Sequence, residues 1–224
     1  MKNWNLYEII WISFFSIAAF MPALMQKDSL FGLSTFITGI FCVLLAAKGK
    51  IMTYAFGMYN TFAYAYISYA NGLYGEMGLN LLFFIPMNIV GFLFWKKRLQ
   101  NNVVEKRRLK VKEFGCLVLT CILSIAVLGW MLSLIKDQNT PYIDATTNIL
   151  SIAATLLMVW RYREQWMLYI VLNVVTIIMW IIRTMQGSSE GLLMIIMWIA
   201  FLTNAVYGLY LWTKRTSQQK TVTP

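Results

Sequence analysis

One apolar segment of the sequence, residues 172–183, carries three side chains that could together bind a small flat ligand. Asn173 and Trp180 are seven residues apart, which is two turns of an α-helix, so they lie on one face roughly 10 Å apart along the axis. Arg183 follows about one turn further along that side. This row of an amide, an indole and a guanidinium on a hydrophobic helix predicts that the helix lines a path for a bound ligand.

Three more asparagines, Asn60, Asn88 and Asn204, lie near the middle of other apolar segments. An amide in hydrocarbon without a partner costs ~2 to 7 kcal/mol, so these side chains must face inward. Hydrogen bonds that join two helices are the alternative explanation, and for a single asparagine it has equal weight. The four amides together favour a polar cavity.

A polar stripe runs along residues 143–160, where Asp144, Asn148, Ser151 and Thr155 follow at spacings of four, three and four. Pro141 precedes this helix, so Asp144 could equally be a capping residue of the first turn. Asn148 lies too deep for capping and is a candidate for substrate binding.

Two tryptophans, Trp180 and Trp198, lie one to two turns below a helix end and are candidate aromatic plates for a flat ligand. Tyr64 and Tyr207 each lie about one turn from an asparagine and join the candidate site. The tryptophans at segment ends are expected to be interfacial belt or packing residues; they are Trp4, Trp95, Trp160, Trp166 and Trp212.

Composition identifies the class of protein, because 59% of the 224 residues are hydrophobic, 12% are charged, and the charges cluster between long apolar runs. This is typical of an all-α integral membrane protein. Pro86 must remove a backbone hydrogen bond from one helix and could form a hinge, although membrane helices often tolerate proline. Eight transmembrane helices are predicted, at residues 6–25, 30–47, 53–69, 79–95, 114–135, 143–160, 166–182 and 192–212.

The topology follows from the basic residues. With both termini in the cytoplasm, sixteen of the nineteen lysines and arginines lie on the inner side, as the positive-inside rule requires. The basic run at residues 96–112 is therefore expected to be a solvated cytoplasmic loop, with anionic lipid as the alternative partner and no role in binding nucleic acid.

Several kinds of chemistry have no residues to support them. The sequence has no histidine and no aspartate or glutamate in the middle of a predicted helix, so we expect no enzyme, metal site or cofactor, and no coupling to protons or sodium. Three cysteines, Cys42, Cys116 and Cys121, form no disulfide framework. These features favour a uniporter.

The sequence also contains an internal repeat. A basic-x-basic pair followed ten residues later by asparagine occurs at 48–60 and again at 161–173, an offset of 113. A Gly-x-x-x-Trp end occurs at 91–95 and 208–212, an offset of 117. Chance similarity between apolar helices is the alternative, but the coincidences favour two parallel three-helix repeats joined by a linker helix. The predicted parts are an accessory helix (1–29), the first repeat (30–95), a basic loop and linker helix (96–135), the second repeat (136–212) and a cytoplasmic tail (213–224).

Two motifs carry a family resemblance, Trp180-x-x-Arg183 and Asn204-x-x-Tyr207. Over residues 30–212 the chain resembles the PnuC family of vitamin transporters, the nicotinamide riboside carriers, which are similar to SWEET sugar transporters in their 3+1+3 helix order. The resemblance implies facilitated diffusion across the bacterial inner membrane, trapping of the product by a cytoplasmic kinase that feeds NAD synthesis, and a homotrimer. It also implies that the four motif residues contact the substrate.

The chemistry of nicotinamide riboside fits these residues. Its flat pyridinium cation can stack on Trp180, with a cation–π contribution of ~0.5 to 2 kcal/mol, and the amides and tyrosines can bind the ribose. Arg183 would repel the cation, so it is expected to point to the outer headgroups, to Asp144 or to Glu190, as a gate or structural anchor. Carriers of thiamine or riboflavin, and a receptor that binds without translocation, remain alternatives.

Overall fold

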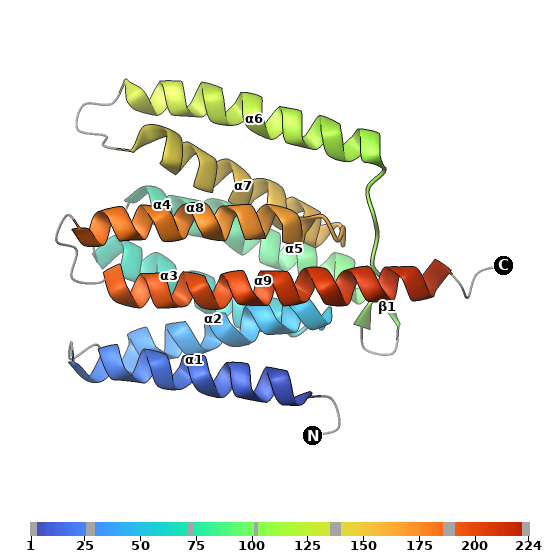
Figure 1. The fold of residues 1–224 in the computed structure, drawn as a ribbon, viewed down its shortest axis with the longest axis horizontal. Coiled ribbons are helices and arrows are strands. Elements are labelled where there is room, and N and C mark those ends of the chain that lie inside the picture. The colour runs from blue at the N-terminus through green and yellow to red at the C-terminus, as the bar shows by residue number, and fades with distance from the viewer. Residues whose placement is uncertain are drawn as a thin grey trace. The chain divides into compact units, whose positions relative to one another are not determined.

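The computed structural model describes residues 4–25, 30–70, 74–100, 103–134, 140–185 and 191–220. The chain divides into two compact units, Met1–Glu105 (unit 1) and Lys106–Pro224 (unit 2), each of which is described by itself. Figure 1 shows the elements in chain order. They are α1 (Leu6–Met25), α2 (Leu30–Lys48), α3 (Thr53–Ala70), α4 (Tyr74–Leu79), η1 (Asn80–Phe84), α5 (Ile85–Lys96), β1 (Leu99–Gln100), β2 (Val103–Val104), α6 (Val111–Ser133), α7 (Pro141–Val159), α8 (Gln165–Met185) and α9 (Gly191–Lys220).

The helices are those of a multi-pass membrane protein. Five helices in the described part of the chain are long and apolar enough to cross a bilayer, and shorter apolar helices occur at Leu6–Ala18 and Leu33–Lys48. The predicted all-α class is confirmed, apart from the short antiparallel pairing of β1 with β2. The crossing helices are Met77–Lys96, Val111–Ser133, Pro141–Val159, Gln165–Ile182 and Ile195–Lys214.

In unit 1, α1 packs on α2, α2 packs on α3, and α3 contacts α4, η1 and α5. The helix expected at 79–95 is interrupted, because a π-helical segment, η1, ends directly before α5. Pro86 has no N–H to donate to the carbonyl of Leu82, and its ring crowds that carbonyl, so the regular α-helical ladder cannot pass this point. A π-bulge is one way in which a helix absorbs such a break.

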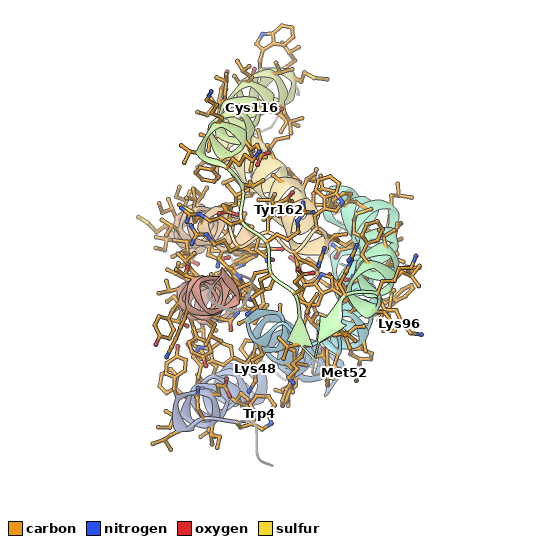
Figure 2. All side chains as sticks on the ribbon, turned by 90° about the vertical axis from the view of Figure 1, so that its right-hand side faces the viewer. Trp4, Lys48, Met52, Lys96, Cys116 and Tyr162 are labelled. Carbon is orange, nitrogen blue, oxygen red and sulfur yellow. The ribbon has the colours of Figure 1, made fainter. Side chains whose placement is uncertain are left out.

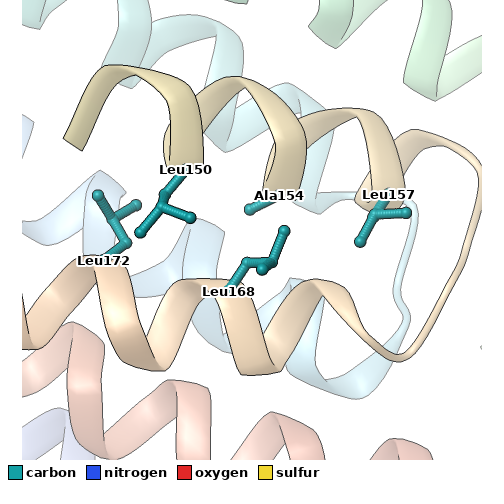
Figure 3. Packing of buried hydrophobic residues seen from close by; sticks show 5 residues of the cluster. All are labelled: Leu150, Ala154, Leu157, Leu168 and Leu172. Atoms are coloured by element: carbon teal, nitrogen blue, oxygen red, sulfur yellow. The ribbon is translucent and has the colours of Figure 1, made fainter. Parts of the chain in front are cut away.

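In unit 2, each helix packs on the next one in the chain, α6 on α7, α7 on α8 and α8 on α9. The contact between α7 and α8 is a small apolar core, drawn in Figure 3. The residues of α7 recur at spacings of four and three and those of α8 at four, which places each set on one helix face. They are Leu150, Ala154, Leu157, Leu168 and Leu172.

Two turns, one in each unit, have the same backbone geometry. Gly49 after α2 and Arg161 after α7 adopt positive φ angles of 70° and 67°. In both turns the next residue donates to a carbonyl five positions back, from Lys50 to Leu45 (2.9 Å) and from Tyr162 to Leu157 (2.9 Å). This is the left-handed C-terminal cap of a helix.

The matching caps give a second way to align the two predicted repeats. Gly49 corresponds to Arg161, an offset of 112, whereas alignment of the basic pairs had set Lys48 opposite Arg161. Aligned on the caps, Thr61 instead of Asn60 lies opposite Asn173. The alignment by basic pairs and the alignment by caps differ by one residue, and the caps are the stricter marker because they fix the backbone conformation of the turn.

Three of the five tryptophans at helix ends are packed inside the units, which is one of the two roles expected of them. Trp95 and Trp212 are 0% exposed and Trp166 is buried, whereas Trp4 and Trp160 are exposed. The rings are buried because they pack on other aromatic side chains within each unit. Trp95 meets Tyr54 edge to face at 5.0 Å, and Trp212 meets Trp166 at 6.0 Å.

The basic run at 96–112 is also more ordered than a solvated loop. In unit 1 the N–H of Val104 donates to the carbonyl of Gly49 (3.0 Å). In unit 2 the backbone of Arg107 exchanges hydrogen bonds with Arg161 and Arg163, and Lys106 is buried. The expectation of a fully solvated loop is wrong for Lys106, whose ammonium lies over the Trp212 ring at 4.8 Å and is stabilised by the aromatic face.

Candidate binding site

Helices α8 and α9 of unit 2 carry the main cluster of predicted site residues. Asn173 and Trp180 on α8 are 3% and 8% exposed, and Asn204 on α9 is 2% exposed. The two helices pack side by side, so polar and aromatic groups from both are withdrawn from the lipid. Tyr207, one turn after Asn204, is half-buried.

Asn173 has the hydrogen-bonding capacity that a ligand needs. Its side-chain amide is buried, at 3% exposed. The hydroxyl of Thr176 on the same helix donates to the carbonyl of Leu172 at 2.8 Å. An amide offers both donors and an acceptor, so binding of a ligand by Asn173 stays a prediction.

The aromatic candidates outside this cluster are less buried. Trp198 is half-buried and meets Phe201 of its own helix edge to face, with ring centroids 5.5 Å apart. Tyr64, on α3 of unit 1, is also half-buried. Binding of a ligand by Trp198 or Tyr64 stays a prediction.

On α7, the polar residues bond mainly within their own helix. The Asn148 amide donates to the carbonyl of Asp144 (2.8 Å), and the hydroxyl of Thr147 donates to the same carbonyl (3.0 Å). The hydroxyl of Thr140, just before the helix, donates to a carboxylate oxygen of Asp144 at 3.3 Å. Asp144 lies in the first turn of α7, but these contacts do not include a bond from a backbone N–H to its carboxylate, so capping by Asp144 and substrate binding by Asn148 both stay predictions.

In unit 1, the two predicted amides hold helices together. Asn60 on α3 donates to the carbonyl of Thr35 on α2 at 2.6 Å. Asn88 on α5 donates to the carbonyl of Phe84 (2.9 Å) and to the hydroxyl of Thr61 on α3 (3.3 Å). Their donors are therefore engaged within unit 1, which agrees with the alternative that these asparagines connect helices.

The remaining predicted residues have less structural support. The side chain of Arg183 lies outside the described part of the chain, as does Glu190, so the predicted gate or anchor stays a prediction. Pro86 is exposed and follows η1, a position that suits a hinge. The described residues contain no cluster of cysteine, aspartate and glutamate that could hold a metal ion.

An ion pair that the sequence analysis missed connects α1 to α2. Lys48 Nζ lies 2.6 Å from Glu8 Oε2, with the two side chains 11% and 3% exposed. The same ammonium lies 4.2 Å from the centroid of the Trp4 ring, and Figure 2 shows Trp4 and Lys48 as neighbours. The available signal was Glu8 itself, because a carboxylate in an apolar helix needs a cation at the same depth.

Comparison with known proteins identifies the family. A family model described as "Nicotinamide mononucleotide transporter" matches residues 29–214. The chain belongs to this family. Two relatives named "Nicotinamide riboside transporter PnuC" match almost the full length of the chain. The protein from Neisseria mucosa is 35% identical, over 95% of this chain and 82% of that one, and the protein from Haemophilus influenzae is 32% identical, over 96% and 92%.

A solved structure supports the same family membership. The crystal structure of the vitamin B3 transporter PnuC matches with a TM-score of 0.82 and 34% identity, covering 97% of this chain and 95% of the other. The resemblance inferred from the two motifs is thus confirmed at the level of the family. The match to the nicotinamide mononucleotide transporter family begins at residue 29, so α1 lies outside the matched part of the chain.

Proposed function

We propose that this protein carries nicotinamide riboside across the membrane by facilitated diffusion. The observation that carries the proposal is the packed pair α8–α9, which buries Trp180, Asn173 and Asn204 within unit 2. The relatives named as nicotinamide riboside transporters support the choice of substrate. Phosphorylation in the cytoplasm would then trap the product and feed NAD synthesis.

The buried groups suit the two halves of this substrate. The Trp180 face attracts a flat pyridinium ring through stacking and cation–π interaction. The amides of Asn173 and Asn204 can donate to and accept from ribose hydroxyls. Because a membrane potential that is negative inside favours entry of a cation by ~2.3 kcal/mol per 100 mV, no carboxylate in the path is needed to attract it.

The riboside fits these groups better than the mononucleotide that the family's description mentions. A phosphate group requires charged donors such as arginine or lysine. The buried polar side chains described on the inner turns of α8 and α9 are uncharged, among them Asn173, Thr176 and Asn204. The described basic side chains of unit 2 lie near helix ends.

The proposal includes a mechanism without ion coupling. All nine aspartates and glutamates of the sequence lie in loops or near helix ends, so the spans offer no carboxylate that could carry a proton or a sodium ion through the membrane. The substrate gradient alone would drive transport. Alternating access around the site would move the riboside from one side to the other.

We also propose an architecture for this transporter. Eight spans would consist of α1 followed by seven helices in a 3+1+3 plan like that of SWEET transporters, with both termini in the cytoplasm of a bacterium and three copies in the assembly. The matching caps at Gly49 and Arg161 support two related halves. A second matched contact supports them too, because Tyr54 packs on Gly91 and Trp166 packs on Gly208.

Uptake into liposomes tests the proposed function. Purified protein in liposomes should accumulate labelled nicotinamide riboside down its gradient, and it should catalyse counterflow without a proton or sodium gradient. Strict dependence on an ion gradient would refute uniport, and binding without counterflow would indicate a receptor. Competition by thiamine, riboflavin and nicotinamide mononucleotide identifies the preferred substrate, and we expect the unlabelled riboside to compete most strongly.

A further inference from the structure

Gln165, the first residue of α8, is fully buried with its amide unused. Neither Oε1 nor Nε2 has a hydrogen-bond partner among the described residues, although the residue is 0% exposed. The buried indole N–H of the next residue, Trp166, also lacks a partner in this part of the chain. Burying such groups without partners is unfavourable, so this end of unit 2 is destabilised in the conformation described.

The equivalent position in unit 1 shows that this arrangement is not required by packing. With the register set by Gly49 and Arg161, Gln165 corresponds to Thr53, which is also 0% exposed. The hydroxyl of Thr53 donates to the carbonyl of Cys42 at 2.8 Å. At the start of α3, a short polar side chain with a hydrogen-bond partner therefore fills the buried position. At the start of α8, the same position holds the longer amide of Gln165, which has no partner among the described residues.

The surroundings of Trp166, the residue next to Gln165, contain groups of the kind that bind nucleosides. A Cβ at Gly208 would lie 2.7 Å from the Trp166 ring, and Trp212 lies at 6.0 Å from the same ring. Aromatic faces, an amide and an indole N–H can together contact a heterocycle and its ribose. The ammonium of Lys106 over Trp212 adds a positive charge that repels a pyridinium ring, so a bound substrate would leave readily.

We propose that Gln165 and the indole N–H of Trp166 form a second hydrogen-bonding site, separate from Trp180, that contacts the ribose hydroxyls of the substrate on its way out. The site would act when the end of unit 2 that holds Lys106, Arg161 and Arg163 opens. Opening gives the buried polar atoms water or ribose as partners, which lowers the free energy of the open state relative to the closed one. This inference rests on the proposed function, because it requires a ribonucleoside substrate.

The test replaces the amide with an apolar side chain of similar length, Gln165→Met, and compares it with Thr53→Val in unit 1. Removing an unsatisfied polar group should raise the melting temperature, by about 2 °C or more for a chain of this size. Removing the satisfied hydroxyl of Thr53 should lower it. Gln165→Met should also slow riboside transport several-fold while leaving equilibrium binding within about two-fold, since the main site is unchanged.

A substrate analogue distinguishes ribose recognition from a general effect. Transport of the 2′-deoxyriboside should be slowed less by Gln165→Met than transport of the riboside. A lower melting temperature, misfolding of the variant or equal slowing of both substrates would overturn the inference. Absence of riboside uptake by the wild-type protein would refute the proposed function itself, whereas normal wild-type uptake with an unchanged Gln165→Met rate would refute only this second site.

Discussion

The Trp166 ring lies directly against Gly208, so closely that a Cβ at position 208 would approach the indole to 2.7 Å. In unit 1, Tyr54 contacts Gly91 in the same way. Each glycine precedes a fully buried tryptophan by four residues, one turn along the same helix face, so the Gly-x-x-x-Trp pattern forms a socket for the first aromatic ring of the neighbouring helix. This contact holds α8 against α9 in the unit that carries most of the candidate site.

Gly208→Ala should therefore destabilise the protein by about 1 to 3 kcal/mol, because the added methyl group forces the rigid indole to move. Thermal unfolding in detergent measures the effect. Gly115→Ala is the matched control, since a Cβ there meets nothing within 4 Å, and it should be neutral or slightly stabilising. Equal melting temperatures for the two variants would contradict the close contact.

Trp180→Ala should weaken riboside binding by about ten-fold or more, which corresponds to the loss of ring stacking and a cation–π contact. Isothermal titration calorimetry measures the affinity for the riboside. Trp160→Ala removes an exposed tryptophan and should leave the affinity unchanged. An unaltered affinity of Trp180→Ala would remove this residue from the proposed site.

Glu8→Gln should destabilise unit 1 by up to about 3 to 5 kcal/mol, because it leaves the Lys48 ammonium partly buried without its carboxylate. In the wild type the N–H of Asn5 donates to Glu8 Oε2 at 3.0 Å, and a glutamine at position 8 can still accept this bond. The substitution therefore removes the ion pair and keeps the capping hydrogen bond.

The control for Glu8→Gln is Glu113→Gln, which changes an exposed glutamate that accepts from the N–H of Lys110 at 2.8 Å. The melting temperature of Glu8→Gln should lie clearly below that of the wild type, whereas that of Glu113→Gln should be close to it. A small effect of Glu8→Gln would show that the Glu8–Lys48 pair adds little to stability.

Pro86→Ala should slow transport without changing riboside affinity, because alanine restores the N–H that can bond to the Leu82 carbonyl and stiffens the helix. Hydrogen exchange across η1 should become slower in the same variant. Unchanged exchange and an unchanged transport rate would mean that the proline is merely tolerated.

Much of the helical fold could be predicted from the sequence, because hydrophobic runs of membrane length are a strong local signal. The interruption before Pro86 was also foreseeable from the missing N–H. The alignment by basic pairs differs by one residue from the alignment by the caps at Gly49 and Arg161, because the pattern of charges does not determine where the backbone caps a helix. The socket at Gly208 depends on a contact between helices, and no periodicity within one helix could reveal it.

For the candidate site, the sequence predicted which residues are buried but not which hydrogen bonds they form, because these depend on contacts between helices. The burial of Asn173, Trp180 and Asn204 agrees with their depth in apolar helices. The engaged donors of Asn60 and Asn88 depend on which carbonyls and hydroxyls the neighbouring helices present. Likewise, tertiary packing determines that the buried amide of Gln165 has no hydrogen-bond partner among the described residues.

The bond between Glu8 and Lys48 also bears on how this transporter could have changed during evolution. Deletion of α1 would leave the Lys48 ammonium at the end of α2 without its carboxylate partner. Loss of α1 and replacement of Lys48 should therefore occur together. Family members without the first helix are therefore expected to carry an uncharged residue at the position of Lys48. Members that keep the helix should retain a carboxylate three residues after the asparagine that caps it, as Glu8 follows Asn5 here.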